Sequence, residues 1–102
     1  MKRSEYRVRL LQAAENDLMD IASFIGADNP SAAEILIDRI EQNLAHLETH
    51  PFLGRAPDDN DLADLGYRYL IVSGYLIFYT IRRKTILVHR IIHGARNYKD
   101  VL

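Results

Sequence analysis

The residues best suited to chemistry lie near the C-terminus, in and after an apolar run typical of a strand buried on both faces. Arg90 interrupts this run, and His93, Arg96 and Tyr98 follow it. An arginine among aliphatic side chains must reach an acceptor or the sheet surface, because an unpaired buried charge is costly. His93 is suited to proton transfer near neutral pH. We expect one strand to deliver these side chains to the same place, although a core strand with a solvated, basic end is the simpler interpretation.

The composition indicates a single domain, residues 1–102. The chain is 48% hydrophobic, which is enough for one modest core. It has no cysteine, so disulfides and thiolate metal sites are excluded. No segment approaches the length of a membrane span, and no signal-peptide region is recognisable. We therefore expect a cytoplasmic protein that does not associate with a membrane.

The net charge of −1 conceals a difference between the two halves of the chain. Residues 1–65 contain six cations and thirteen acids, whereas residues 66–102 contain seven cations and one acid. Helix propensity and capping account for many acids in a helical half. The basic half is explained less well, and it suggests an acidic or polyanionic partner on one side.

The first half reads as a strand followed by a helical hairpin. Apolar residues alternate with Arg7 and Arg9, which predicts a half-buried edge strand with both arginines facing outward. Apolar residues three and four apart then predict a helix over residues 12–26, ended by Gly26. A second helix is expected from the N-cap Asn29 to about residue 50, before Pro51.

Residues 51–65 are expected to be the only long loop. They include four aspartates, namely Asp58, Asp59, Asp61 and Asp64. Their spacing does not fit a calcium loop, which also needs a glycine in mid-loop and a closing glutamate. We therefore expect solvated turn residues here and no metal site.

Three strands complete the chain. They are expected over residues 67–72, over residues 75–81 and from Thr85 onward, joined by a Ser73-Gly74 hairpin turn and a turn at residues 82–84. The predicted fold class is therefore α+β, in the order β-α-α-β-β-β. A helical hairpin packs on a mostly antiparallel four-stranded sheet, and a short C-terminal tail extends beyond the last core strand.

This order resembles the RelE/ParE toxin superfamily, and in particular its ParE-like branch, the toxins of plasmid-stabilisation toxin–antitoxin modules. Four short motifs carry the resemblance: Pro51-x-x-Gly54-Arg55, Leu65-Gly66-x-Arg68, Tyr75-x-Ile77-x-Tyr79 and Arg90-x-x-His93-Gly94-x-Arg96. Each is weak alone, but together they span nearly the whole chain in the family's order. Thr80 departs from the pattern, since many relatives have a basic residue there.

The resemblance implies a toxin that binds DNA gyrase and blocks it. Such activity requires a protein surface rather than catalytic residues, and it implies no cofactor. The expected target-binding residues are Arg90, His93, Arg96, Tyr98, Val101 and Leu102, because arginine and tyrosine dominate hot spots in protein interfaces.

The resemblance also implies a cognate antitoxin encoded beside the gene, whose C-terminal segment neutralises the toxin. Arg7, Arg9 and an apolar groove on the helical hairpin are the expected contacts, and an acidic, amphipathic segment would complement them. A homodimer and a toxin–antitoxin hetero-oligomer both remain open.

The alternative within the superfamily is a RelE-type nuclease that cuts messenger RNA on the ribosome. Such cleavage needs a cation cluster and groups that transfer protons, and the residues available are Arg68, Arg90, His93, Arg96 and Tyr98. The isoelectric point of about 6.4 and the shortage of lysines favour the gyrase-binding interpretation, with no catalytic residues and no direct nucleic-acid contact.

Two further points stay open. A binding relative that is not toxic is a third interpretation. Arg68 and Arg90 could also be structural, with Glu41 or Glu48 as their acidic partners, because pairing cannot be read from the sequence.

Overall fold

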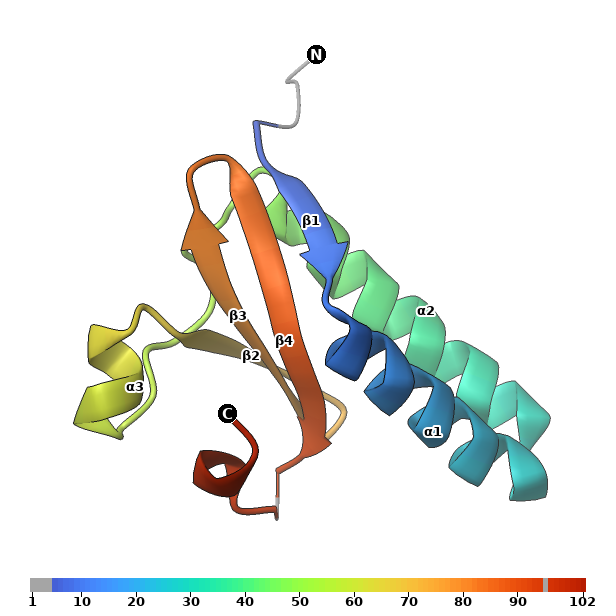
Figure 1. Ribbon diagram of the computed structural model, residues 1–102. Coiled ribbons are helices and arrows are strands. Elements are labelled where there is room, and N and C mark those ends of the chain that lie inside the picture. The colour runs from blue at the N-terminus through green and yellow to red at the C-terminus, as the bar shows by residue number, and fades with distance from the viewer. Residues whose placement is uncertain (1–4, 95) are drawn as a thin grey trace.

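The computed structural model describes residues 5–94 and 96–102, which form two layers (Figure 1). A four-stranded sheet in the order β1-β4-β3-β2 makes one layer, and a helical hairpin covers one of its faces. The elements are β1 (Arg7–Leu10), α1 (Gln12–Asp28), α2 (Pro30–Leu47), α3 (Asn60–Asp64), β2 (Arg68–Val72), β3 (Tyr75–Arg82), β4 (Thr85–His93) and the 3₁₀ turn η1 (Tyr98–Asp100).

Strand β1 pairs with β4 in parallel, and the other two strand pairs are antiparallel. The predicted α+β class, with a helical hairpin on a mostly antiparallel sheet, is therefore confirmed. β1 is an edge strand, as the alternation of Arg7 and Arg9 with apolar residues predicted. Within the described part of the chain, no helix is long and apolar enough to cross a membrane.

The hydrophobic core lies between the helical hairpin and the sheet. Side chains at helical spacing on α1 and α2 pack against residues that alternate along the strands. The fully buried members include Ala14, Ile40, Leu47, Ile77, Tyr79, Ile86 and Val88. Their burial fixes the register of the sheet, because a slip of one residue would turn these side chains toward solvent.

The C-terminal ends of α1 and α2 both differ from the ends predicted from the sequence. α1 continues past Gly26 to Asp28, and Asn29 serves both helices. The Asn29 N–H donates to the Ile25 carbonyl, while its side chain accepts the Ala32 N–H at 3.1 Å. α2 ends at Leu47 rather than near residue 50, because the following residues already form turns.

The segment expected to be one long loop contains the short helix α3. Asp59 caps this helix by accepting the Leu62 N–H at 3.0 Å, and Leu62 is buried. The backbone hydrogen bond from Leu62 is also the main reason that the pKa of Asp59 is lowered. One of the four loop aspartates therefore has a local structural role. The described residues include no group of three potential ligands that could hold a metal.

The remainder of this segment is fixed by Tyr79, whose side chain is fully buried. The Tyr79 hydroxyl donates to the Pro51 carbonyl at 2.8 Å and accepts the Gly54 N–H at 2.9 Å. A Cβ atom at Gly54 would lie 2.6 Å from that hydroxyl, so only glycine fits there. Two of the motifs that carry the family resemblance thus meet as one structural unit.

Arg68 completes the same unit. Its Nε donates to the Gly54 carbonyl at 3.0 Å, and a terminal nitrogen donates to the Phe52 carbonyl at 3.2 Å. Its guanidinium also lies 5.4 Å from the centre of the Phe52 ring. Arg68 therefore anchors the loop that precedes β2, which answers whether it has a structural role.

Candidate partner-binding surfaces

Arg90 is held by Asp17 on α1. Its Nε and a terminal nitrogen donate to the two Asp17 oxygens at 2.7 and 2.8 Å, and both side chains are mostly buried. These hydrogen bonds raise the pKa of Arg90 above its ordinary value. Asp17, rather than Glu41 or Glu48, is thus the acidic partner. This pair could not be predicted from the sequence, because the two residues are far apart along the chain.

His93 and Arg96 lie together at the end of β4. They line one cavity of about 200 Å³, with Asp20 of α1 and Tyr75 of β3. The His93 ring meets the Tyr75 ring edge-on, with centroids 5.5 Å apart. Both His93 and Arg96 are exposed, so this corner of the molecule presents an imidazole and a guanidinium side by side to a partner.

The C-terminal tail folds back against the open face of the sheet rather than extending away from it (Figure 1). The Tyr98 ring packs on Phe78, with centroids 5.0 Å apart. Lys99 forms an ion pair with Asp59 at 3.3 Å. A terminal nitrogen of Arg90 donates to the Val101 carbonyl at 3.5 Å. The expectation that the tail lies beyond the core is therefore wrong, because aromatic and polar contacts return it to the sheet.

Five of the six expected target-binding residues line two cavities, and the sixth, Tyr98, packs on Phe78. His93 and Arg96 line the first cavity, while Val101 and Leu102 line a second of about 210 Å³. Arg90 lies at the second cavity and is bound to Asp17, whose carboxylate lines the first. Arg90, through Asp17, thus links the two cavities.

His89 is a residue that the sequence did not single out. A shift in register between β3 and β4 pairs Phe78 with Arg90 but Tyr79 with Val88, so His89 is the additional residue of a β-bulge. Its Nε2 is 2.9 Å from the Thr80 hydroxyl, and its ring lies 4.9 Å from that of Tyr67.

The contact between His89 and Thr80 explains why this chain has a threonine at position 80, where many relatives have a basic residue. Thr80 is almost completely buried, and its hydroxyl has a partner in His89. A long cation at that position could not keep its charge in water without displacing the imidazole. Burial, followed by the charge of Arg82, lowers the pKa of His89.

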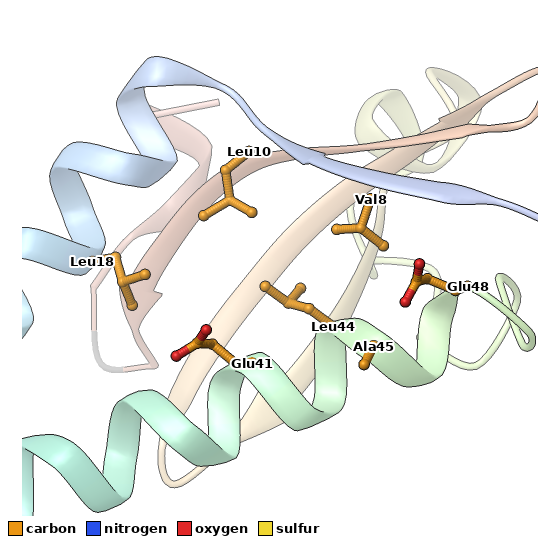
Figure 2. A pocket seen from close by; sticks show the side chains of 7 residues that line it. All are labelled: Val8, Leu10, Leu18, Glu41, Leu44, Ala45 and Glu48. Atoms are coloured by element: carbon orange, nitrogen blue, oxygen red, sulfur yellow. The ribbon is translucent and has the colours of Figure 1, made fainter. Parts of the chain in front are cut away.

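A groove runs along the other side of the molecule, between β1 and α2 (Figure 2). It has a volume of about 410 Å³ and an apolar floor, and two glutamates project into it. The lining residues are Val8, Leu10, Leu18, Glu41, Leu44, Ala45 and Glu48. The groove expected on the helical hairpin is therefore present, with β1 as its second wall.

The backbone of β1 also faces this groove. The N–H groups of Arg7 and Leu11 donate to carbonyls of β4 and its preceding turn. Because strand residues alternate, the polar groups of Val8 and Leu10 point to the opposite edge. No strand of the described sheet lies beyond β1, and on this edge the Tyr6 N–H donates to the Glu48 carbonyl at 3.1 Å, while Val8 and Leu10 have no strand partner there. Arg7 and Arg9 are exposed beside this edge.

Comparisons with known proteins agree with this arrangement. A family model described as "ParE toxin of type II toxin-antitoxin system, parDE" matches residues 8–98. A solved structure described as a chromosomal ParDE toxin–antitoxin system from P. aeruginosa has a TM-score of 0.72 at 18% identity. The match covers 89% of this chain and 98% of the other. No curated protein matches. The chain belongs to the ParE toxin family of type II toxin–antitoxin systems.

Proposed function

We propose that this toxin acts by binding DNA gyrase and blocking it, and that a cognate antitoxin encoded beside it neutralises it in the cytoplasm. One observation favours gyrase binding over RNA cleavage as the activity of this toxin. Three of the five side chains that a nuclease would need are committed to holding the fold. Arg68 binds loop carbonyls, Arg90 binds Asp17, and Tyr98 packs on Phe78.

The cation cluster that phosphodiester cleavage requires is thus not assembled from these residues. The two remaining side chains, His93 and Arg96, line one cavity together, and the other residues that line this cavity include no cation. An exposed arginine next to an imidazole on a rigid strand end instead suits a protein interface. Because the tail is already docked, presenting this surface costs little conformational entropy on binding.

The open edge of β1 is the proposed antitoxin site. An extended segment of the antitoxin would pair with the outward backbone groups of Val8 and Leu10 and place apolar side chains in the groove. Arg7 and Arg9 favour acidic residues on one flank of that segment. Glu41 and Glu48 favour a cation on its other flank, which refines the acidic segment expected from the sequence alone.

A two-armed assay tests the target. One arm follows supercoiling and gyrase-dependent DNA breaks, and the other follows cleavage of message on stalled ribosomes. We expect gyrase inhibition and intact message. Arg96→Ala should weaken gyrase inhibition at least several-fold, since hot-spot contacts contribute on the order of 1–4 kcal/mol. Arg55→Ala is the matched control, because it removes the same charge from an exposed site elsewhere.

His93→Ala should weaken inhibition less than Arg96→Ala does. The proposal fails if message is cut, if cleavage disappears with His93→Ala, and if gyrase is unaffected. That result would make the protein a ribosome-dependent nuclease of the RelE type.

The antitoxin site has a separate test. Co-expression of the neighbouring reading frame should restore growth, and the two proteins should co-purify. Ala45→Arg, in the groove, should prevent both effects without loss of toxicity. Gln42→Arg adds the same side chain to another exposed position of α2 and should change neither. Equal co-purification of the two variants would place the antitoxin elsewhere.

A further inference from the structure

A group of cations lies at the end of the sheet opposite the docked tail. The strand register places Arg7 and Arg82 on either side of Thr85, because both pair with that residue across neighbouring strands. Arg9 pairs with Leu87 one row further along. Residues paired across strands share a face, so these three arginines project from the open face of the sheet, away from the helical hairpin.

The turn between β3 and β4 extends this group. Arg83 and Lys84 form the turn and are exposed, and the Lys84 backbone carbonyl accepts the Arg7 N–H at 2.9 Å. Arg83 has a φ of 57°, so a left-handed backbone position is held by a bulky cation. Together the five cations form a surface that we call the basic end: Arg7, Arg9, Arg82, Arg83 and Lys84.

No carboxylate of the described residues forms an ion pair with a cation of the basic end. The ion pairs of the described residues involve Arg90 and Lys99, and neither belongs to this group. Lys84 lies over the ring of Tyr6, 4.8 Å from its centre, instead of beside an acid. Glu48 shares a cavity with Arg7 and Arg9 but forms no ion pair with either. The five positive charges of the basic end are therefore exposed to solvent close to one another.

We propose that the basic end binds the phosphate backbone of duplex DNA. The strand spacing of about 4.8 Å puts the attachment points of Arg7 and Arg82 roughly 10 Å apart. That distance is comparable with the groove widths of about 6 and 12 Å that separate the two phosphate rows of B-DNA. The acidic helices lie on the opposite face of the sheet, so the charge distribution orients the molecule on a polyanion.

Duplex DNA fits this surface better than the other polyanions do. Single-stranded RNA is held largely by stacking on aromatic side chains. The aromatic residues of the open face, Tyr67, Tyr69, Phe78 and Tyr98, contact one another or His89 and lie away from the basic end. An acidic peptide needs apolar pockets as well as charge, and the apolar groove, where the antitoxin segment is proposed to bind, lies on the other side of β1.

Binding of DNA by the basic end does not require gyrase to be the target. It would change the expectation that the toxin makes no direct contact with nucleic acid. The low isoelectric point predicted no direct contact with nucleic acid, but net charge is an average over the whole chain. The tertiary structure brings two cations from near the N-terminus, Arg7 and Arg9, together with the three cations of residues 82–84 on one surface. Binding of this kind is expected to be independent of base sequence, because contacts to phosphates carry no information about the bases.

Fluorescence anisotropy of the purified toxin with a labelled duplex of about 20 base pairs tests the proposal. We expect a dissociation constant of roughly 10⁻⁴–10⁻⁶ M that weakens steeply with salt. Arg7→Gln combined with Arg82→Gln should reduce affinity about tenfold or more and lower the salt slope by about 2. Arg39→Gln combined with Arg55→Gln makes the same change of net charge away from the basic end and should have little effect.

Equal affinity of these two double variants would overturn the proposal, as would tighter binding of single-stranded RNA or of a polyglutamate peptide. Circular dichroism checks that each variant is folded. The single variants Arg9→Gln and Arg82→Gln provide a second measurement if a double variant unfolds. The assay contains toxin and duplex but no antitoxin, so failure here is distinguishable from failure of the antitoxin site, to which Arg7 and Arg9 are also assigned.

Discussion

Asp17 on α1 binds both the side chain and the backbone of β4 at Arg90. Beyond the two hydrogen bonds to the guanidinium, an Asp17 oxygen accepts the Ile91 N–H at 2.9 Å. Strand β1 ends at Leu10, opposite Val88, so at Arg90 and Ile91 β4 pairs with β3 on one side but has no neighbouring strand on its β1 side. Asp17 supplies the acceptor that a longer β1 would supply, and Arg90 neutralises the carboxylate.

Asp17→Ala should therefore destabilise the toxin by about 3 kcal/mol, because it leaves Arg90 and the Ile91 N–H without a partner in a mostly buried site. Asp17→Asn should cost less, since its amide oxygen can still accept the Ile91 N–H. Urea unfolding of both variants, alone and combined with Arg90→Met, measures the coupling. A loss below about 1 kcal/mol for Asp17→Ala would contradict the assigned role.

Gly54→Ala should be strongly destabilising. The added methyl would lie within 3 Å of both the Tyr79 hydroxyl and the Tyr69 carbonyl, and the second of these is backbone. Tyr79→Phe should cost about 1–3 kcal/mol, because the buried Gly54 N–H and Pro51 carbonyl lose their shared partner. Thermal unfolding measures both. Gly66→Ala is not a suitable control, since its φ of 88° strains any other residue, so Ala56→Ser is used.

His89 should make stability depend on pH near neutrality. Its pKa is lowered from the ordinary 6.5, chiefly by burial, so the unfolded chain takes up the proton first as the pH falls. The stability that neutral His89 contributes is complete above pH 6.5 and is lost as the pH falls through the folded-state value. The melting temperature of the wild type should drop between about pH 7 and 5 by more than that of His89→Gln. Parallel curves for the two proteins would exclude this role.

Deleting residues 98–102 should destabilise the domain by about 1–3 kcal/mol, because it uncovers Phe78 and removes the Val101 carbonyl from Arg90. Lys99→Gln should cost less than about 1 kcal/mol, since its ion pair is exposed. Chemical unfolding separates the two effects. An unchanged midpoint after deletion would mean that the tail contributes only to partner binding.

The hydrophobic pattern was sufficient to predict the elements that build the core. Alternation along β1 and the three-four spacing of the helices depend on neighbours in the chain, so they can be read locally. The hairpin turn at Ser73 and Gly74 was also predictable, and both residues have positive φ values. Helix α3 was missed because a single turn capped by Asp59 has too few apolar residues to show a period.

The sequence by itself determined the order of the four strands and the two long helices, the apolar faces that form the core and the family, because motif spacing and periodicity are properties of the chain. Only the tertiary structure decided that Arg90 binds Asp17, that the tail returns to Phe78, and that Arg7 and Arg82 share a face. Each of these relationships joins segments that are distant in sequence. They follow from how the strands pair and how the hairpin packs, and a one-dimensional pattern does not record that geometry.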